Sequence, residues 1–425
     1  MASELEVWLG ERRAGFLLEA AGDWSFVYRD EALSGPGMLP YPVALTLPRT
    51  RVAHHGPAVT AVFANLLPDG ELRRRLAQSL GMSAANEFGL LGRVGGDCPG
   101  ALRLNAPGQL PQPAGSRCLN EQELRNAMAV LPMHPLLAEA DALSATLPGD
   151  FDKLPVGLED GQVALCSGAR LSTHILKPAR PGLRESVFNE AFVMTLAAAA
   201  GLPVAECQII HGQLAVLCVS RVDRRMDGAT RALHMEDLCQ VGGLLAGHKY
   251  EREGGLALHE VVRILRRYSC APAQDIRHLM RWLLFSFLVG FGAGHAKQLA
   301  LLYGPQGPRL APFFGLWSTH VYNEMNHRLG FAVGGEDRPD WLTAARWVAC
   351  AEAAGIRPAY LLDELRALAQ TLPRLAAEQA EGFQRRNGFA NVVRQIRVLI
   401  EQRARQALVA LEAERLHGKG PSTRA

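Results

Sequence analysis

The chain has 425 residues, of which 48% are hydrophobic and 20% charged, so a substantial core is available and wholesale disorder is excluded. The 45 Lys and Arg residues against 42 Asp and Glu leave a formal net charge of +3, which gives no whole-chain case for a nucleic-acid coat or a membrane-surface protein. This length predicts two or three domains.

Targeting and compartment signals are weak. Residues 1–9 contain no cationic segment followed by an apolar one, so we expect no signal peptide. The most apolar stretch, Trp282–Val289, is too short to span a bilayer. The eight cysteines form no CxxC pair and no zinc-type spacing with histidine, which is typical of free thiols in a reducing compartment. We therefore expect a soluble cytoplasmic protein without a metal site.

Hydrophobic periodicity in the first hundred residues alternates between strand and helix. Leu5–Phe16 predicts a hairpin, Trp24–Tyr28 a further strand and Val43–Leu47 a weaker one. Leucines at three- and four-residue spacing predict one helix over Val62–Leu80, and the glycine density of Phe88–Leu104 favours a tight loop before a closing strand.

The stretch Ala106–Ser116 is rich in Pro, Gly and Gln and predicts a linker. Beyond it, several short strands surround a helix over Glu185–Ala200, and after Asp223 the pattern becomes helical. We thus divide the chain into an N-terminal subdomain, a linker with a connecting helix, an α+β lobe and a helical lobe: residues 1–105, 106–147, 148–224 and 225–425.

One long segment is almost free of acidic residues. Between Ile276 and Glu336 there is no Asp, and only Glu324 and Glu336 carry negative side chains. The rest of the chain is rich in acids, so the gap is local rather than compositional.

Eight short motifs follow one another along the chain: Asn65–Gly70 (NLLPDG), Gly95–Leu102 (GGDCPGAL), Thr173–Pro178 (THILKP), Asn189–Phe192 (NEAF), His234–Gln240 (HMEDLCQ), Lys249–Gly255 (KYEREGG), His295–Lys297 (HAK) and Leu310–Thr319 (LAPFFGLWST). In this order and spacing they resemble the motifs of the HipA family, the toxin half of bacterial type II toxin–antitoxin modules. The resemblance implies an α+β, bilobal HipA/protein-kinase-like fold with a small N-terminal α/β subdomain and a mostly helical C-terminal lobe. It also implies Ser/Thr kinase ancestry and pairing with a small helix-turn-helix antitoxin that binds operator DNA.

Phosphoryl transfer needs a lysine on the nucleotide phosphates, a loop over them, a base, and Mg²⁺ held by Asp and Asn. The resemblance makes Lys177, at the end of a predicted strand, the candidate nucleotide lysine, where the alternative is a solvated strand-end lysine. Glu190 is a candidate partner for Lys177, and an exposed helix glutamate is the equal alternative.

The predicted phosphate loop departs from the family pattern of Gly, a small residue, Gln, any residue and Lys. Here it reads Gly149-Asp150-Phe151-Asp152-Lys153, so Lys153 remains a candidate for nucleotide contact. Two carboxylates would repel ATP where it is most negative, so we favour an ordinary acidic turn.

The hinge expected against the adenine also differs. The family pattern is Val-Glu-Arg-aromatic-Asp-Arg, whereas Val219–Arg224 has Ser220 in place of the acid and Val222 in place of the aromatic residue. Since hinge contacts are largely made by the backbone, this change alone would weaken nucleotide binding without abolishing it.

The catalytic loop of the family reads Asp, any residue, His, any residue, Lys, Asn. In this chain Ala293 stands at the position of the base and Gln298 at that of the metal-binding Asn, and Gly315 replaces the Mg²⁺ aspartate further on. A methyl group cannot accept a proton, and a missing general base typically costs about 10²–10⁴-fold in rate. His295 and Lys297 remain as candidate phosphate contacts, although a structural role is favoured for His295.

We therefore predict a pseudokinase: a HipA-type component that lacks phosphoryl transfer, to which we assign no cofactor, and that acts by binding a HipB-like helix-turn-helix antitoxin and, through it, operator DNA. The alternative is an active Ser/Thr kinase toxin that uses ATP and Mg²⁺ on a translation factor such as an aminoacyl-tRNA synthetase. A third possibility is a regulator that senses nucleotide without transfer.

The C-terminal segment Gln384–Ala425 carries nine Lys and Arg against three Glu. A basic stripe of this kind docks phosphates or an acidic partner, or else it is a solvated helix face with a frayed tail from Gly418 onward; we favour the solvated face.

Overall fold

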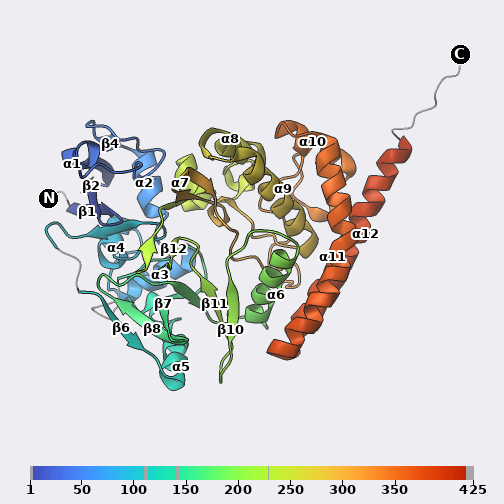
Figure 1. Cartoon of the computed structure of the whole chain (residues 1–425), viewed down its shortest axis with the longest axis horizontal. Helices are drawn as coiled ribbons and strands as arrows, with labels where there is room; N and C mark the ends of the chain where they lie inside the picture. The colour runs from blue at the N-terminus through green and yellow to red at the C-terminus, as the bar shows by residue number, and fades with distance from the viewer. Residues whose placement is uncertain (1–2, 110–112, 139–143, 228, 418–425) are drawn as a thin grey trace, which may run out of the picture. The chain divides into compact units, whose positions relative to one another are not determined.

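A computed structural model describes residues 3–109, 113–138, 144–227 and 229–417 (Figure 1). The chain divides into two compact units. Unit 1 comprises 1–180, 210–249 and 300–306, and unit 2 comprises 181–209, 250–299 and 307–425.

Unit 1 begins with a five-stranded antiparallel sheet in the order β4-β3-β2-β1-β5. Its strands are β1 (Ser3–Leu9), β2 (Arg12–Ala20), β3 (Asp23–Tyr28), β4 (His54–His55) and β5 (Leu102–Asn105). Inward-facing residues such as Leu17 and Phe26 are fully buried in the core beneath it. The hairpin predicted over Leu5–Phe16 is confirmed as β1 and β2, which turn at Gly10 with a positive φ of 61°.

Four helices accompany this sheet: α1 (Asp30–Leu33), α2 (Pro57–Ala64), α3 (Gly70–Ser79) and α4 (Glu87–Val94). The single helix predicted over Val62–Leu80 is wrong, since α2 ends before Asn65 and α3 starts after Asp69. Pro68 explains the break, because proline has no N–H to donate within a helix and disfavours helical geometry in the preceding residue.

Of two further predictions for this region, one is wrong and one is right in part: the loop and closing strand predicted within Phe88–Leu104 are present at residues 95–101 and in β5, but the start of that segment is helical. The glycine-rich start of Phe88–Leu104 forms α4, whose N-cap Asn86 accepts a hydrogen bond from the N–H of Gly89. Within α4 a Cβ on Gly92 would lie 3.2 Å from the side chain of Leu5, so this glycine allows close packing rather than a loop. Val43–Leu47 forms no strand, only an isolated bridge between Ala44 and Leu47.

The second sheet of unit 1 contains five consecutive antiparallel neighbours in the order β11-β9-β7-β8-β6. They are β6 (Gly115–Cys118), β7 (Leu154–Glu159), β8 (Gln162–Ser167), β9 (His174–Lys177) and β11 (Val216–Ser220). The helix α5 (Glu121–Val130) adds Met128 to the small core of this sheet. Strand β10 (Cys207–Ile210) is where the chain passes from unit 2 back into unit 1.

The remaining elements of unit 1 are short: η1 (Pro135–Leu137), β12 (Arg224–Arg225), β13 (Arg231–Ala232), β14 (Met235–Asp237), α7 (Leu238–Gly242), η2 (Ala246–His248) and β15 (Ala300–Gly304). Asp237 caps α7 by accepting from the N–H of Gln240, whose side chain accepts from the N–H of Asp237 in return. Strand β14 pairs with β15, which brings residues more than sixty positions apart together.

Unit 2 is mostly helical. Its elements are α6 (Ser186–Ala199), η3 (Glu251–Glu253), α8 (Leu258–Tyr268), α9 (Pro272–Val289), η4 (Ala296–Gln298), β16 (Gly307–Leu310), η5 (Pro339–Trp341), α10 (Ala344–Ala353), α11 (Pro358–Asn387) and α12 (Asn391–His417). The long helices α11 and α12 run side by side and also contact α6 and α9 (Figure 1). Trp317, which the sequence places in the core, is 3% exposed.

The mixture of helices and antiparallel sheets establishes the α+β class. Among the helices of the described residues, none combines the length and apolar character that a membrane crossing needs.

Candidate functional site

Lys177 ends β9, a central strand of the second sheet of unit 1. In register it faces Leu217 of β11, while the preceding Leu176 points into the core and is fully buried. Strand alternation therefore places the half-buried Lys177 on the face opposite the core, on a backbone fixed by two neighbouring strands.

The loop Gly149–Lys153 is tied down by ion pairs. Asp150 lies 2.7 Å from the ammonium nitrogen of Lys249, and Asp152 lies 3.0 Å from a guanidinium nitrogen of Arg75. Lys153 donates to the carbonyl oxygen of Pro148, within its own turn. The carboxylates that the sequence marks as unsuited to phosphate thus have cationic partners within unit 1.

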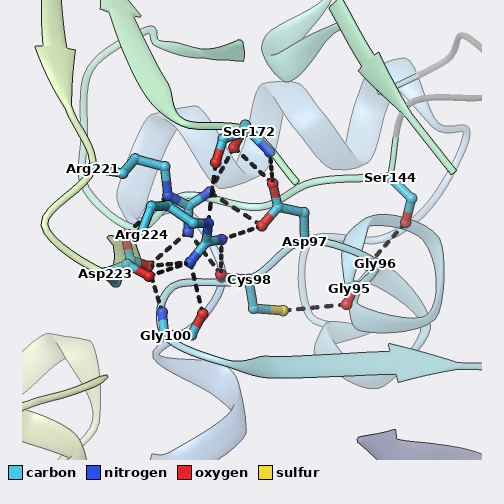
Figure 2. Close-up of polar contacts among 10 residues, drawn as sticks. All are labelled: Gly95, Gly96, Asp97, Cys98, Gly100, Ser144, Ser172, Arg221, Asp223 and Arg224. Carbon is cyan, nitrogen blue, oxygen red and sulfur yellow. Dashed lines mark hydrogen bonds and ion pairs between the residues drawn. The ribbon is translucent and has the colours of Figure 1, made fainter. Parts of the chain in front are cut away.

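The hinge Val219–Arg224 takes part in a buried charged cluster of unit 1. Figure 2 shows Arg221 and Arg224 bridging two carboxylates, those of Asp97 and Asp223. All four side chains are less than a tenth exposed, and the two positive and two negative charges balance. Such a pairing compensates the desolvation of each charge.

Neutral groups complete this hinge cluster. Ser172 donates its hydroxyl and backbone N–H to Asp97, and the N–H of Gly100 donates to Asp223 at 2.6 Å. Burial would raise the pKa of Asp97, but Arg221 and Arg224 hold it below its usual range. Asp223 behaves in the same way, with its pKa lowered mainly by Arg221.

The hinge cluster joins two motifs that the sequence treats separately, Gly95–Leu102 and Val219–Arg224 (Figure 2). Sequence reasoning missed this pairing, although each motif carries an acid or an arginine inside an otherwise small or apolar segment. Therefore Asp223 and both arginines of the hinge serve to fix its backbone to the loop that follows α4.

A second buried polar cluster of unit 1 was not predicted. The carboxylate of Glu236 accepts from the hydroxyl of Tyr303 at 2.5 Å and from the N–H of Leu45 at 3.0 Å, and its nearest histidine nitrogen, on His234, is 4.0 Å away. Burial raises the pKa of Glu236 to about 7 and lowers that of His234 to about 3. The alternating motif His234–Asp237 gives only a faint signal for this cluster.

In unit 2 the NEAF motif supports the segment that follows Gly315. Asn189 is fully buried and forms two hydrogen bonds with the backbone of Ser318, one as donor at 2.9 Å and one as acceptor at 2.7 Å. Glu190, the next residue on α6, is 1% exposed, so its alternative as an exposed helix glutamate is wrong.

The turn Gly290–Gly294 that leads into the catalytic loop is held by neutral contacts. The hydroxyl of Thr319 accepts from the N–H of Gly292 at 2.9 Å and donates to the carbonyl of Gly290 at 3.0 Å. A Cβ on Gly330 would lie 1.8 Å from the carbonyl oxygen of Gly294, so only glycine fits there.

His295 and Lys297 follow this turn and are 5% and 7% exposed. The ring of His295 meets that of Tyr250 edge-on, with centroids 4.8 Å apart. Tyr250 belongs to the KYEREGG motif, whose Glu251 accepts from the N–H of Ala332 at 2.7 Å. This motif therefore supports the catalytic loop from a second side.

The position of the catalytic base and the two positions of the metal ligands offer neither a proton acceptor nor a charged oxygen. Ala293 ends in a methyl group, and Gly315 has no side chain and adopts a positive φ of 66°. The amide oxygen of Gln298 is buried and has no hydrogen-bond partner among the described residues. The two metal-ligand positions thus offer a single neutral oxygen, that of Gln298, whereas the family pattern has an aspartate carboxylate at 315 and the shorter amide of asparagine at 298.

These residues do not fit Mg²⁺, which prefers carboxylate oxygens. In the described part of the chain no group of three or more His, Cys, Asp or Glu residues has metal-site geometry. Of the two acids in the acid-poor segment, Glu324 is exposed, and Glu336 pairs with Arg338 at 2.7 Å.

The candidate residues are thus distributed over both units. Lys153 and Lys177 belong to unit 1, whereas Glu190, His295 and Lys297 belong to unit 2. The pairing of Lys177 with Glu190 and the contacts of these residues with nucleotide stay predictions.

The basic C-terminal segment is only partly a surface stripe. Arg394 and Arg405 are exposed on α12, but Arg403 is 6% exposed and pairs with Asp340 at 2.7 Å. The predicted tail from Gly418 onward lies outside the described residues.

Comparison with known proteins places both parts of the chain. Residues 5–105 match the family model described as HipA N-terminal domain, and residues 145–378 match the HipA-like C-terminal domain.

Named relatives agree. A protein of Sinorhizobium fredii named "Putative kinase Y4mE" is 36% identical over 83% of this chain and 86% of its own length. The "Serine/threonine-protein kinase toxin HipA" of Shewanella oneidensis is 28% identical over 88% of each chain. A solved structure from the Shewanella oneidensis complex of HipA, HipB and operator DNA matches with a TM-score of 0.81 and 24% identity, covering 96% of this chain and 98% of that one. At that identity, the structural match establishes the fold.

Proposed function

This chain belongs to the HipA family, and we propose that it acts in a toxin–antitoxin module as a kinase-fold protein that does not transfer phosphoryl groups. The observation that carries this proposal is the contrast within unit 2. Thr319 and Tyr250, which support the catalytic loop, and Asn189, which supports the segment after Gly315, are in place. Ala293, Gln298 and Gly315 supply neither a base nor a charged metal ligand.

The retained activity is binding. The solved relative is a complex of HipA with HipB and operator DNA. By this relationship we propose a HipB-like helix-turn-helix antitoxin as the partner, with operator DNA bound through that antitoxin in the cytoplasm.

Phosphoryl transfer is tested with labelled ATP and Mg²⁺. The unaltered chain is expected to show neither autophosphorylation nor substrate labelling above background. The triple variant Ala293→Asp/Gln298→Asn/Gly315→Asp returns base and metal ligands, and aspartate is among the residues that tolerate the positive φ of position 315. Because loss of a general base alone costs about 10²–10⁴-fold, labelling is expected to rise by at least about 100-fold.

The matched control for this assay is the triple variant with Asn in place of both aspartates, Ala293→Asn/Gln298→Asn/Gly315→Asn. It has nearly the same side-chain volume and no charge, so it is expected to remain inactive. Labelling by the unaltered chain would contradict the proposal. Partner binding is tested separately, by size-exclusion chromatography with the antitoxin and by a mobility shift of operator DNA.

An active kinase toxin acting on a translation factor is the second candidate, and the kinase names of the relatives favour it. It needs another carboxylate to hold Mg²⁺. Glu324→Gln would then abolish labelling, whereas it changes nothing if the chain is inactive.

A further inference from the structure

Every residue of the loop Gly149–Lys153 contacts a partner elsewhere in unit 1 or within its own turn. The backbone carbonyl of Gly149 accepts from the N–H of Asp69 at 3.0 Å, which ties the loop to the start of α3. Farther along α3, Arg75 pairs with Asp152 and also donates to the carbonyl of Pro132 at 2.6 Å. The loop is thus attached to one helix at two points.

The two residues most foreign to a phosphate loop are also held. Asp150 shares the ammonium group of Lys249 with Asp69, at 2.7 and 3.4 Å, and the side chain of Lys249 is only 12% exposed. The ring of Phe151 lies 4.8 Å from the guanidinium carbon of Arg180, in cation–π contact.

The lysine of the loop is engaged within its own turn. Lys153 donates to Pro148, and a Cβ on Gly149 would lie 2.6 Å from its ammonium nitrogen, so its side chain folds back over the loop. A loop that cradles phosphate presents backbone N–H groups and a cation to the ligand without competing anions.

Three consecutive residues of this loop each contact a cationic side chain. Asp150 meets Lys249 and Phe151 meets Arg180, so both departures from the family pattern form attachments, and Asp152, at the position that accepts any residue, meets Arg75. Since Asp69 and Lys249 both belong to family motifs, Asp150 has joined an ion pair that the motifs already contain.

We propose that Gly149–Lys153 is a clasp, closed by its own side chains on α3, Lys249 and Arg180, that keeps nucleoside triphosphate phosphates out of the former nucleotide site. Asp150 and Phe151 are the residues that decide this exclusion. The inference rests on the proposed function, since a chain that transfers phosphate must admit ATP.

The closure of the clasp is tested by hydrogen exchange of the backbone amides of residues 149–153 in the full chain. Asp150→Ala/Phe151→Gln restores the small residue and the glutamine of the family pattern. Its amides are expected to exchange at least about tenfold faster, because local opening then costs about 1.4 kcal/mol less. Arg180→Ala opens the clasp from the partner side with the loop sequence unchanged and is expected to act in the same direction.

Exclusion is tested by titrating a fluorescent ATP analogue, with Mg²⁺ and with a chelator. The unaltered chain is expected to show no saturable binding, and Asp150→Ala/Phe151→Gln is expected to bind. Glu11→Gln removes the same charge from an exposed turn of unit 1 and is expected to match the unaltered chain in both measurements.

The outcomes separate this inference from the proposed function. If the unaltered chain binds the analogue as tightly as the loop variant, or if the loop variant folds and still does not bind, the clasp is wrong. Binding by the unaltered chain without phosphoryl transfer overturns only the clasp, whereas transfer overturns the proposed function as well. If the double variant fails to show a cooperative melt, Phe151→Gln alone, which keeps both ion pairs, replaces it in the same comparison.

Discussion

The hinge of unit 1 and the catalytic turn of unit 2 are held by opposite kinds of interaction. At the hinge, buried arginines and aspartates neutralise one another, and Glu236 lies buried nearby in sequence with only neutral donors. The turn Gly290–Gly294 is held by neutral contacts, namely the hydroxyl of Thr319 and Gly330 packed against a carbonyl, and the neighbouring Ser318 is held by the neutral amide of Asn189. The stability of unit 1 should therefore depend on pH and on charge removal, and that of the turn on hydrogen bonds and volume.

The largest effect is expected at the hinge. Arg221→Ala leaves two buried carboxylates short of a cation and should lower the free energy of unfolding by about 3–5 kcal/mol, measured by urea denaturation at neutral pH. Arg225→Ala, four residues on and half exposed beside Asp227, is the matched control and should cost less than about 1 kcal/mol. If Arg221→Ala and Arg225→Ala lowered the free energy of unfolding equally, the buried ion pairs would not be what stabilises the hinge.

Glu236→Gln tests the pH dependence of unit 1. Its pKa is raised to about 7 in the folded chain from 4.5, so the folded state keeps a proton that the unfolded state loses first, and stability falls as pH rises through this window. Glutamine does not titrate, so the variant lacks this fall in stability. Its free energy of unfolding, relative to that of the unaltered chain, should therefore increase by at most about 3 kcal/mol as the pH rises through this window.

The measurement for Glu236→Gln is the free energy of unfolding at a series of pH values. His234, Tyr303, Tyr41 and Asp237 face or adjoin the carboxylate and are present in both chains. A difference that stays constant with pH would show that the carboxylate is not buried as described.

Asn189→Ala addresses the neutral side of the comparison. It leaves the buried N–H and carbonyl of Ser318 without their partner, and we expect a loss of about 2 kcal/mol that does not change between pH 5 and 8. Asn126→Ala, on the exposed face of α5, is the control and should cost less than about 0.5 kcal/mol. A pH-dependent loss would place charge at the catalytic turn.

The smallest effect is expected for Asp150→Asn, which keeps the shape of the clasp and removes one charge. Asp150 is 47% exposed, so solvent screens its pair with Lys249, and we expect a change of about 0.2–1 kcal/mol that shrinks in high salt. A change of several kcal/mol in the free energy of unfolding would mean that the clasp contributes substantially to the stability of the folded chain.

Local pattern predicted most elements well because burial on one face leaves a clear period. The helix Ser186–Ala199 lies within a residue of its predicted range, Glu185–Ala200, at each end. The predictions of secondary structure failed where a residue type has more than one structural role. Glycine in α4 permits packing against Leu5 instead of opening a loop, and Pro68 divides a leucine pattern that otherwise continues.

The sequence by itself determined the α+β class, the family and the three vacant chemical positions, because these depend on residue identity and on spacing along the chain. Only the tertiary structure decided what the remaining polar residues do. That Asp97 meets Arg221, that Asp150 meets Lys249 and that Glu236 lies buried beside Tyr303 all depend on segments roughly 65 to 125 positions apart. Such partners are chosen by burial and charge compensation, which a reading along the chain cannot see.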